Sequence, residues 1–248
     1  MNLILIHPYE LDPDGRVCLT DGRAEHIRGV LRALPGKVLR VGLLNGAAGQ
    51  AAVLEICDKE VLLQCEFADQ IPPRPDVDLL LALPRPKVMK RLWAQLAALG
   101  VGRIILTNAE KVERFYFDSH VLEPDFYTAR LIEGLQQAGD TRLPEVRIVR
   151  ELKPFLEDEL DTLFPASGIR LLADPSAGKS IFQTLNNSAP ARTLLAVGPE
   201  GGWTPYELEM LSSHGFQVFN AGPRILRTDT ACVALLSALT LLSGADEK

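Results

Sequence analysis

A repeated alternation of strand-like and helix-like segments most constrains the fold of this chain. Between residues 79 and 242, short apolar runs of strand length alternate with longer runs that have helical periodicity. The expected strands are 79–83, 104–107, 146–149, 169–173, 194–197 and 216–219, and the expected helices are 88–99, 126–137, 181–185, 206–213 and 229–242. This alternation predicts an α/β fold with helices on both faces of a mainly parallel sheet. In such sheets, ligands bind beyond the carboxyl ends of the strands.

Residues 1–71 show a different pattern, with short apolar runs and little helical periodicity. The runs of strand length lie at 3–6, 38–44, 52–56 and 61–67. Asn45-Gly46 is typical of a hairpin turn, because both residues tolerate positive φ. Three prolines in the segment 70–76 then favour an extended connection. We therefore predict two domains, a small β-rich one over 1–71 and an α/β domain over 76–248.

One helix is expected inside the β-rich region, with Thr20 or Asp21 as its N-cap. Four apolar residues at helical spacing would form its buried stripe: Ile27, Val30, Leu31 and Leu34. Arg28 and Arg32 would then share a face outside that stripe. Between residues 16 and 40, six basic residues stand against two acidic ones, a local charge of +4. This charge is consistent either with phosphate contacts or with an ordinary solvated surface.

The composition argues against several classes of protein. The 248 residues carry a formal net charge of −6, whereas proteins that coat nucleic acid non-specifically depend on many Lys and Arg residues. No segment approaches the roughly 18 uncharged apolar residues of a membrane span, and the apolar run at 3–6 is too short for a signal peptide. The four cysteines include no C-x-x-C pair, so neither a zinc site nor a disulfide framework is indicated. We expect a cytoplasmic protein with no metal and no membrane partner.

The loop at 173–180 approximates the phosphate-binding pattern G-x-x-x-x-G-K-[ST] between a strand and a helix. However, Ala173 replaces the first glycine of that pattern, and Pro175 removes one backbone N–H donor. An ordinary strand-to-helix connection fits these residues better. A P-loop-like nucleotide hydrolase is therefore kept only as an alternative function.

A second loop, Gly198-Pro199-Glu200-Gly201-Gly202, directly follows the apolar run 194–197. Its glycines allow a ligand to approach the backbone closely, and its proline stiffens one step of the path. Thr204, Pro205 and Glu207 then supply an N-cap, a proline in the first helical turn and the partner glutamate of a capping box. The geometry of this loop is thus specified from both sides, although a glycine-rich turn can also be a plain connector.

A third loop, 220–230, again leads from a strand into a helix, with Thr228 as a cap for that helix. Its Ile225-Leu226 pair is unusual for an exposed loop and predicts that these side chains cover a ligand. An aromatic ring held between backbone segments fits this expectation. Arg224 and Arg227 are either solvated charges or contacts to an anionic partner.

The residues GPEGG and the later GPRILRTDTA together resemble the C-terminal signature of the RsmE family of 16S ribosomal RNA uridine-N3 methyltransferases. The likeness extends to residues 26–32 (HIRGVLR), 96–104 (LAALGVGRI) and 137–146 (QAGDTRLPEV), whereas 87–111 and 136–140 include departures from the family pattern. The resemblance implies a SPOUT-type α/β domain with a mainly parallel sheet and a deep trefoil knot. It also implies a small N-terminal PUA-like β-barrel domain that binds RNA, and a homodimer.

The resemblance further implies S-adenosyl-L-methionine as the cofactor and 16S rRNA or the small ribosomal subunit as the partner. The expected cofactor-binding residues are Ala173, Val197, Gly198, Glu200, Gly201, Gly202, Asn220, Ala221, Gly222, Ile225, Leu226, Arg227 and Thr230. The residues assigned to RNA contact are Arg16, His26, Arg28, Arg32, Arg85 and Lys87.

Methylation of uridine N3 requires loss of the N3 proton and in-line geometry between the nitrogen and the methyl group. A cation beside a uracil oxygen would stabilise the developing anion, and Arg227 is assigned to that role. Glu200 is either a general base or a carboxylate that braces its own loop, and the bracing role is the stronger interpretation. A non-catalytic RNA-binding module remains open as a further alternative function.

Overall fold

The computed structural model describes residues 2–165, 167–185 and 192–243. The chain divides into two compact units, each of which is described by itself. Unit 1 comprises Met1–Arg74 and Ile132–Leu143, and unit 2 comprises Pro75–Leu131 and Pro144–Lys248.

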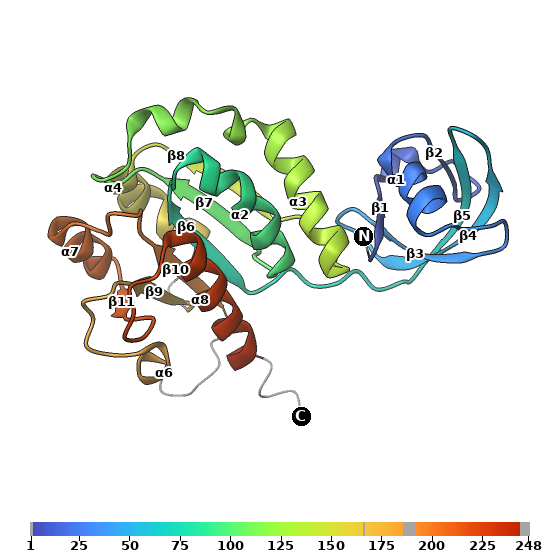
Figure 1. Cartoon of the computed structure of the whole chain (residues 1–248). Coiled ribbons are helices and arrows are strands. Elements are labelled where there is room, and N and C mark those ends of the chain that lie inside the picture. The colour runs from blue at the N-terminus through green and yellow to red at the C-terminus, as the bar shows by residue number, and fades with distance from the viewer. Residues whose placement is uncertain (1, 166, 186–191, 244–248) are drawn as a thin grey trace. The chain divides into compact units, whose positions relative to one another are not determined.

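Unit 2 contains a six-stranded sheet in the order β11-β9-β10-β6-β7-β8, and every neighbouring pair in it is parallel (Figure 1). The strands are β6 (Val77–Ala82), β7 (Arg103–Thr107), β8 (Glu145–Val149), β9 (Ile169–Ala173), β10 (Thr193–Val197) and β11 (Phe216–Phe219). Strand β10 is buried along its whole length, which is typical of a parallel strand covered on both faces. The predicted α/β fold with a mainly parallel sheet is confirmed.

The α-helices that begin in unit 2 are α2 (Pro86–Ala98), α3 (Pro124–Ala138), α4 (Leu152–Pro154), α5 (Leu160–Leu163), α6 (Ile181–Thr184), α7 (Pro205–Ser213) and α8 (Thr228–Ser243). Shorter 3-10 and π-helical segments are η3 (Arg114–Asp118), η4 (His120–Leu122) and η5 (Phe155–Glu159). Helices α2 and α8 pack against each other on one face of the sheet (Figure 1).

The sequence of α2 explains why this helix packs on the sheet. Met89, Leu92, Trp93 and Leu96 follow the helical spacing i, i+3, i+4 and i+7, and all four side chains are fully buried. Burying each large apolar side chain stabilises the fold by about 1.5–3 kcal/mol. The indole Nε1–H of Trp93 donates a hydrogen bond to the Val121 carbonyl oxygen at 2.9 Å, so its polar atom is also satisfied.

Unit 1 contains a five-stranded sheet in the order β1-β3-β4-β5-β2. The strands are β1 (Ile4–Ile6), β2 (Arg16–Leu19), β3 (Val38–Leu43), β4 (Ala48–Ile56) and β5 (Val61–Phe67). Only β1 and β3 pair in parallel; the other pairs are antiparallel. Asn45 has a φ of 61° at the predicted turn between β3 and β4. The sequence did not predict β2, whose signal is limited to the alternation of buried Val17 and Leu19 with exposed neighbours.

The predicted helix of unit 1 differs from expectation in its form. It consists of α1 (Gly22–Glu25), capped by the Asp21 carboxylate, and of the π-helical segment η2 (His26–Val30). The wider π turn changes the phase of the side chains, so Val30 and Leu34 are 69% and 73% exposed, and the prediction of one buried stripe is wrong. Arg32 lies beyond the helix with a φ of 45°, so it does not share a helical face with Arg28.

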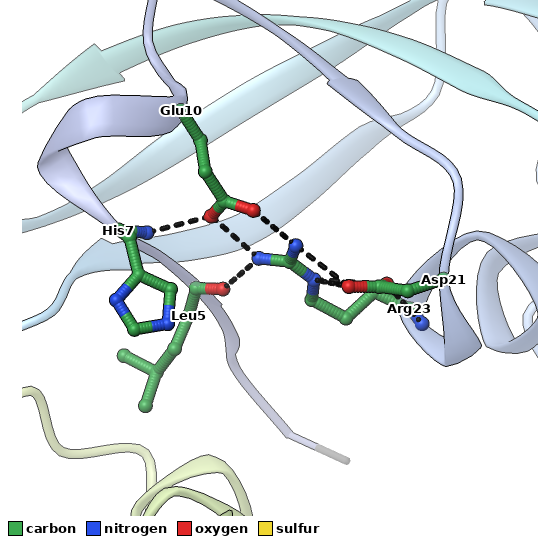
Figure 2. Close-up of polar contacts among 5 residues, drawn as sticks. All are labelled: Leu5, His7, Glu10, Asp21 and Arg23. Carbon is green, nitrogen blue, oxygen red and sulfur yellow. Dashed lines mark hydrogen bonds and ion pairs between the residues drawn. The ribbon is translucent and has the colours of Figure 1, made fainter.

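Arg23 is held by two carboxylates in unit 1 (Figure 2). Its guanidinium donates to Glu10 and Asp21 and also to the Leu5 carbonyl oxygen at 2.8 Å, while Glu10 accepts from the His7 backbone N–H at 2.7 Å. Burial opposes ionisation of both acids, but their hydrogen bonds and charge contacts with Arg23 hold the pKa of Glu10 and of Asp21 below the ordinary values. The charge of Arg23 is therefore neutralised inside unit 1 and is not part of a basic surface.

The segment Ile132–Leu143 belongs to unit 1 through specific hydrogen bonds. The backbone N–H groups of Asn2 and Leu3 both donate to the Gln136 carbonyl oxygen, at 2.9 and 3.0 Å. The Thr141 hydroxyl donates to the Gly46 carbonyl oxygen at 2.6 Å. The C-terminal part of α3 and the loop after it thus complete the first unit.

Within the described ranges, no helix combines the length and apolar character needed to cross a bilayer. The same residues contain no group of three or more His, Cys, Asp or Glu side chains placed to hold a metal ion. Cys232 lies fully buried in α8, and burial raises the pKa of its thiol to about 12.

Candidate functional site

A cavity of about 650 Å³, including the part open to solvent, lies in unit 2 where three loops meet beyond the strands β9, β10 and β11. This is the edge of the sheet at which a parallel α/β fold is expected to bind ligands. Its lining residues are Ala173, Asp174, Pro175, Val197, Gly198, Pro199, Glu200, Gly202, Trp203, Ala221, Gly222, Arg224, Ile225, Leu226, Thr228, Ala231 and Leu235.

The loop after β10 has a path that favours glycine at two positions. A Cβ atom on Gly198 would lie 3.0 Å from Trp203 Nε1 and 3.1 Å from its Cδ1, so the indole ring packs directly on the glycine. Gly202 has a φ of +68°, in the left-handed region that favours glycine. Thr204 and Glu207 then form the predicted capping box of α7, with Pro205 in the first turn. The predicted geometry of this loop is therefore confirmed.

Two side-chain groups hold the same loop against neighbouring elements. Glu200 Oε1 accepts a hydrogen bond from the Arg85 backbone N–H at 3.1 Å, at the start of α2. Lys111 Nζ donates to the Gly201 carbonyl oxygen at 2.7 Å. The buried carboxylate of Glu207 also accepts from the Glu110 backbone N–H at 2.7 Å, which ties the start of α7 to the loop after β7. These contacts were not foreseen, because they join residues far apart in the sequence.

The loop after β11 forms the opposite wall of the cavity. Gly222 has a φ of +113°, and its N–H donates to Asn220 Oδ1 at 3.1 Å. Thr228 Oγ1 donates to the Gly198 carbonyl oxygen at 3.4 Å, which joins this loop to the one after β10. Ile225 is 85% exposed although its side chain lines the cavity. An apolar side chain in this position is available to cover a bound ligand.

The loop at 173–180 is closed by its own hydrogen bonds. Asp174 Oδ1 accepts from the Ser176 backbone N–H at 2.8 Å and from the Ser176 hydroxyl at 2.5 Å. The Ala177 N–H donates to the Asp174 carbonyl oxygen, and Asn220 Nδ2 donates to the Ala177 carbonyl oxygen at 2.6 Å. The N–H groups of Ser176 and Ala177 are thus already used, which argues against a phosphate cradle and against the hydrolase alternative.

The structure brings most of the predicted cofactor residues together around this cavity. Nine of them line it: Ala173, Val197, Gly198, Glu200, Gly202, Ala221, Gly222, Ile225 and Leu226. Four are outside its lining: Gly201, Asn220, Arg227 and Thr230. The lining residues outside the predicted set of cofactor residues are Asp174, Pro175, Pro199, Trp203, Arg224, Thr228, Ala231 and Leu235. Most of these adjoin the predicted loops, whereas Leu235 is separated from them by two helical turns and carried no signal.

Arg227 is exposed and lies one residue from the cavity lining. Its guanidinium makes no hydrogen bond or ion pair with any residue that the structure describes, so it is available to a partner molecule. Arg85 and Lys87, at the start of α2, are also exposed, and the Arg85 backbone is tied to Glu200.

The predicted RNA-binding residues of unit 1 differ in their surroundings. Arg16 and Arg32 are exposed, and Arg16 Nε donates to Gln64 Oε1 at 3.2 Å. Arg28 is half-buried, with Nε donating to the Ala24 carbonyl oxygen at 3.3 Å. His26 is also half-buried, and its Nε2 is enclosed without a hydrogen-bond partner among the described residues.

Comparison with known proteins gives consistent results over nearly the whole chain. Residues 72–240 match the RNA methyltransferase domain family. The ribosomal RNA small subunit methyltransferase E of Treponema pallidum is 30% identical over 242 residues, covering 94% of this chain and 88% of that protein. The ribosomal RNA small subunit methyltransferase E 1 of Borreliella burgdorferi is 28% identical, and the similarity covers 94% of this chain and 95% of the Borreliella protein.

Solved structures show the same fold. A ribosomal RNA small subunit methyltransferase E from Neisseria gonorrhoeae, bound to S-adenosyl methionine, superposes with a TM-score of 0.78 at 22% identity over 98% of each chain. A putative methyltransferase from Legionella pneumophila, in complex with its cofactor, gives a TM-score of 0.75 at 23% identity over 97% of each chain. From the matched domain and the similarity along its length, the chain belongs to the ribosomal RNA small subunit methyltransferase E family, the RsmE family.

Proposed function

We propose that this protein transfers the methyl group of S-adenosyl-L-methionine to N3 of a uridine in 16S ribosomal RNA. The observation that carries the proposal is the cavity bounded by the loops after β9, β10 and β11. Two of these loops contain the residues that resemble the family signature. The similar structures from Neisseria and Legionella contain bound S-adenosyl methionine, and the relatives from Treponema and Borreliella are methyltransferases of small-subunit ribosomal RNA.

The cavity has the chemical character that this cofactor requires. Its apolar wall includes Val197, Leu226 and Leu235, which suits an adenine ring. Gly202 and Gly222 line the cavity, and a Cβ built on either would meet no atom within 4 Å. The backbone at these two positions therefore leaves room for a ligand, in addition to adopting positive φ.

When bound, the cofactor supplies a methyl group on a positively charged sulfur. The protein's contribution is to hold the cofactor between the loops, to orient the uridine and to stabilise charge on the uracil ring. We assign the last of these roles to Arg227, whose guanidinium is exposed and has no partner among the described residues. For Glu200, the hydrogen bond from the Arg85 N–H supports the bracing role over that of general base.

Unit 1 is proposed to bind RNA as a PUA-like domain, with the exposed Arg16 and Arg32 making the strongest contributions. For unit 2, we infer a SPOUT-type domain with a trefoil knot, acting as a homodimer in the cytoplasm. These proposals rest on the family resemblance. Measurement of the salt dependence of RNA binding by Arg16→Ala and Arg32→Ala tests the first, because each lost phosphate contact lowers the slope by about one.

The proposed activity is tested by mass spectrometry of 16S rRNA from a strain that lacks the protein. We expect one uridine to lose 3-methylation and to regain it when the intact gene is restored. A methylation pattern identical to that of the parent strain would refute the proposal. In that case, binding of RNA without binding of S-adenosyl-L-methionine would support the non-catalytic alternative, and nucleotide turnover that Lys179→Ala abolishes would support the hydrolase.

A further inference from the structure

Asp174 is a buried carboxylate in the wall of the cavity, and the proposed chemistry does not yet use it. It directly follows β9 and is 8% exposed. Its Oδ1 is satisfied by the N–H and hydroxyl of Ser176. Its Oδ2 accepts no hydrogen bond from the described residues, yet it is not enclosed by protein atoms. This oxygen is therefore available to a group in the cavity.

No basic side chain of the described residues lies within ion-pair distance of Asp174. A carboxylate that is largely removed from water is costly unless a positive group or hydrogen-bond donors compensate it. The other acid in the cavity wall, Glu200, already accepts the Arg85 N–H. Among the described residues, Asp174 is thus the acid of this wall whose negative charge has no positive partner and whose second oxygen accepts no hydrogen bond.

From this environment we infer that Asp174 stabilises the positively charged sulfonium of bound S-adenosyl-L-methionine and so gives the site a preference for this cofactor over its demethylated product. The inference rests on the proposed function. It assigns a specificity role to a residue of the 173–180 loop, whose internal hydrogen bonds hold the carboxylate in place.

The change of charge during the reaction explains why a preference for the charged cofactor would help the product to leave. The N3 proton of uridine is released to solvent water, the N3–methyl bond forms with the nitrogen electron pair, and the sulfur–methyl bond breaks with its electron pair left on sulfur. The sulfonium thereby becomes a neutral thioether. Asp174 then faces a ligand without its counter-charge, so the product S-adenosylhomocysteine is held less tightly and leaves the site more readily.

The test is calorimetric titration of the wild type and Asp174→Asn with three ligands. These are S-adenosyl-L-methionine, S-adenosylhomocysteine and an analogue with a protonated amine in place of the methylsulfonium. Asn keeps an oxygen that accepts from Ser176 while removing the charge. Because a hydrogen bond or contact to a charged group contributes about 1.5–3 kcal/mol, we expect at least about a tenfold loss of affinity for both charged ligands. Affinity for S-adenosylhomocysteine should change by less than about threefold.

Glu209→Gln is the matched control, because Glu209 is an exposed acid of α7 outside the cavity lining and its loss changes the net charge equally. It should leave all three affinities unchanged. Normal binding of S-adenosylhomocysteine by Asp174→Asn also shows that the cavity is folded. An equal loss of affinity for all three ligands would indicate that Asp174 contacts a group they share, such as the ammonium of the methionine part, and would overturn the inference. Unchanged affinity for all three ligands would overturn it as well. A wild type that binds none of the three refutes the proposed function itself.

Discussion

The carboxylate of Glu200 accepts the backbone N–H of Arg85 at 3.1 Å, and this contact ties the glycine-rich loop after β10 to the first residue before α2. The two residues lie 115 positions apart in the chain. The sequence alone therefore does not indicate that the Glu200 carboxylate accepts a hydrogen bond from the Arg85 backbone.

Glu200→Gln is expected to retain methylation within about threefold, since the amide oxygen can still accept the Arg85 N–H. Glu200→Ala removes the acceptor, and we expect cofactor affinity to fall by about tenfold. Calorimetry and single-turnover methylation measure the two effects. If Glu200→Gln instead lost activity by about a hundredfold with unchanged cofactor binding, Glu200 would be a general base.

Arg227→Ala is expected to bind the cofactor normally but to methylate RNA about a hundredfold more slowly, because it lacks the cation assigned to the uracil oxygen. Arg227→Lys keeps the charge without the planar fork of donors and should be intermediate. Single-turnover rates at saturating RNA separate this effect from weaker RNA binding. Methylation by Arg227→Ala at the wild-type rate would exclude the proposed role.

Gly198→Ala should weaken cofactor binding by about tenfold or more, because the new Cβ forces the Trp203 indole, at 3.0 Å, to move. Replacing Trp203 by Phe in the same protein should recover part of this loss, so the two changes are expected to be non-additive. Gly178→Ala is the matched control, since a Cβ there meets nothing within 4 Å. Additive effects in the double variant would show that the ring is not the obstacle.

Acid should destabilise unit 1 through the carboxylates that hold Arg23. Because the folded state lowers the pKa of Glu10 and Asp21, their stabilisation is present above the unfolded values of 4.5 and 3.8 and is lost as pH falls through the lower folded values. Arg23→Met should cost about 1–2 kcal/mol at pH 7, because the ion pair with Glu10 is only partly buried and the one with Asp21 is screened by solvent. It should also flatten the dependence of thermal unfolding on pH between 7 and 3. An unchanged acid profile in this variant would contradict the assignment.

Much of unit 2 was predictable because its elements are local patterns of apolar residues. The bounds of β9 and β11 agree with the predicted runs, and α2 carries a regular apolar stripe. The π turn of η2 was not predictable from the sequence. Its extra residue rotates every later side chain around the helix axis, and no residue type or spacing indicates it. The segment 152–163 was also missed, because it is divided into the short helices α4, η5 and α5.

The sequence predicts only those parts of the site that contain glycines and other residues typical of turns. The loops around Gly198 and Gly222 carry such signals, and both line the cavity. Lys111 is tied to Gly201 by a contact across 90 positions, for which a single sequence holds no information. In the sequence, Asp174 belongs to a loop that only approximates a phosphate-binding pattern. Its burial, and the fact that only its Oδ1 accepts hydrogen bonds from Ser176, are visible only in the structure.

The chain passes between its two units three times, because residues 132–143 return to unit 1 after the first part of unit 2 has been made. A fragment that stops at Arg74 would therefore lack the carbonyl of Gln136, which accepts from the N–H groups of Asn2 and Leu3, and the hydroxyl of Thr141, which donates to the Gly46 carbonyl oxygen. A single cleavage in the proline-rich connection would leave the halves joined by α3. An exchange of unit 1 between relatives would therefore have to include residues 132–143, and with them the second half of α3.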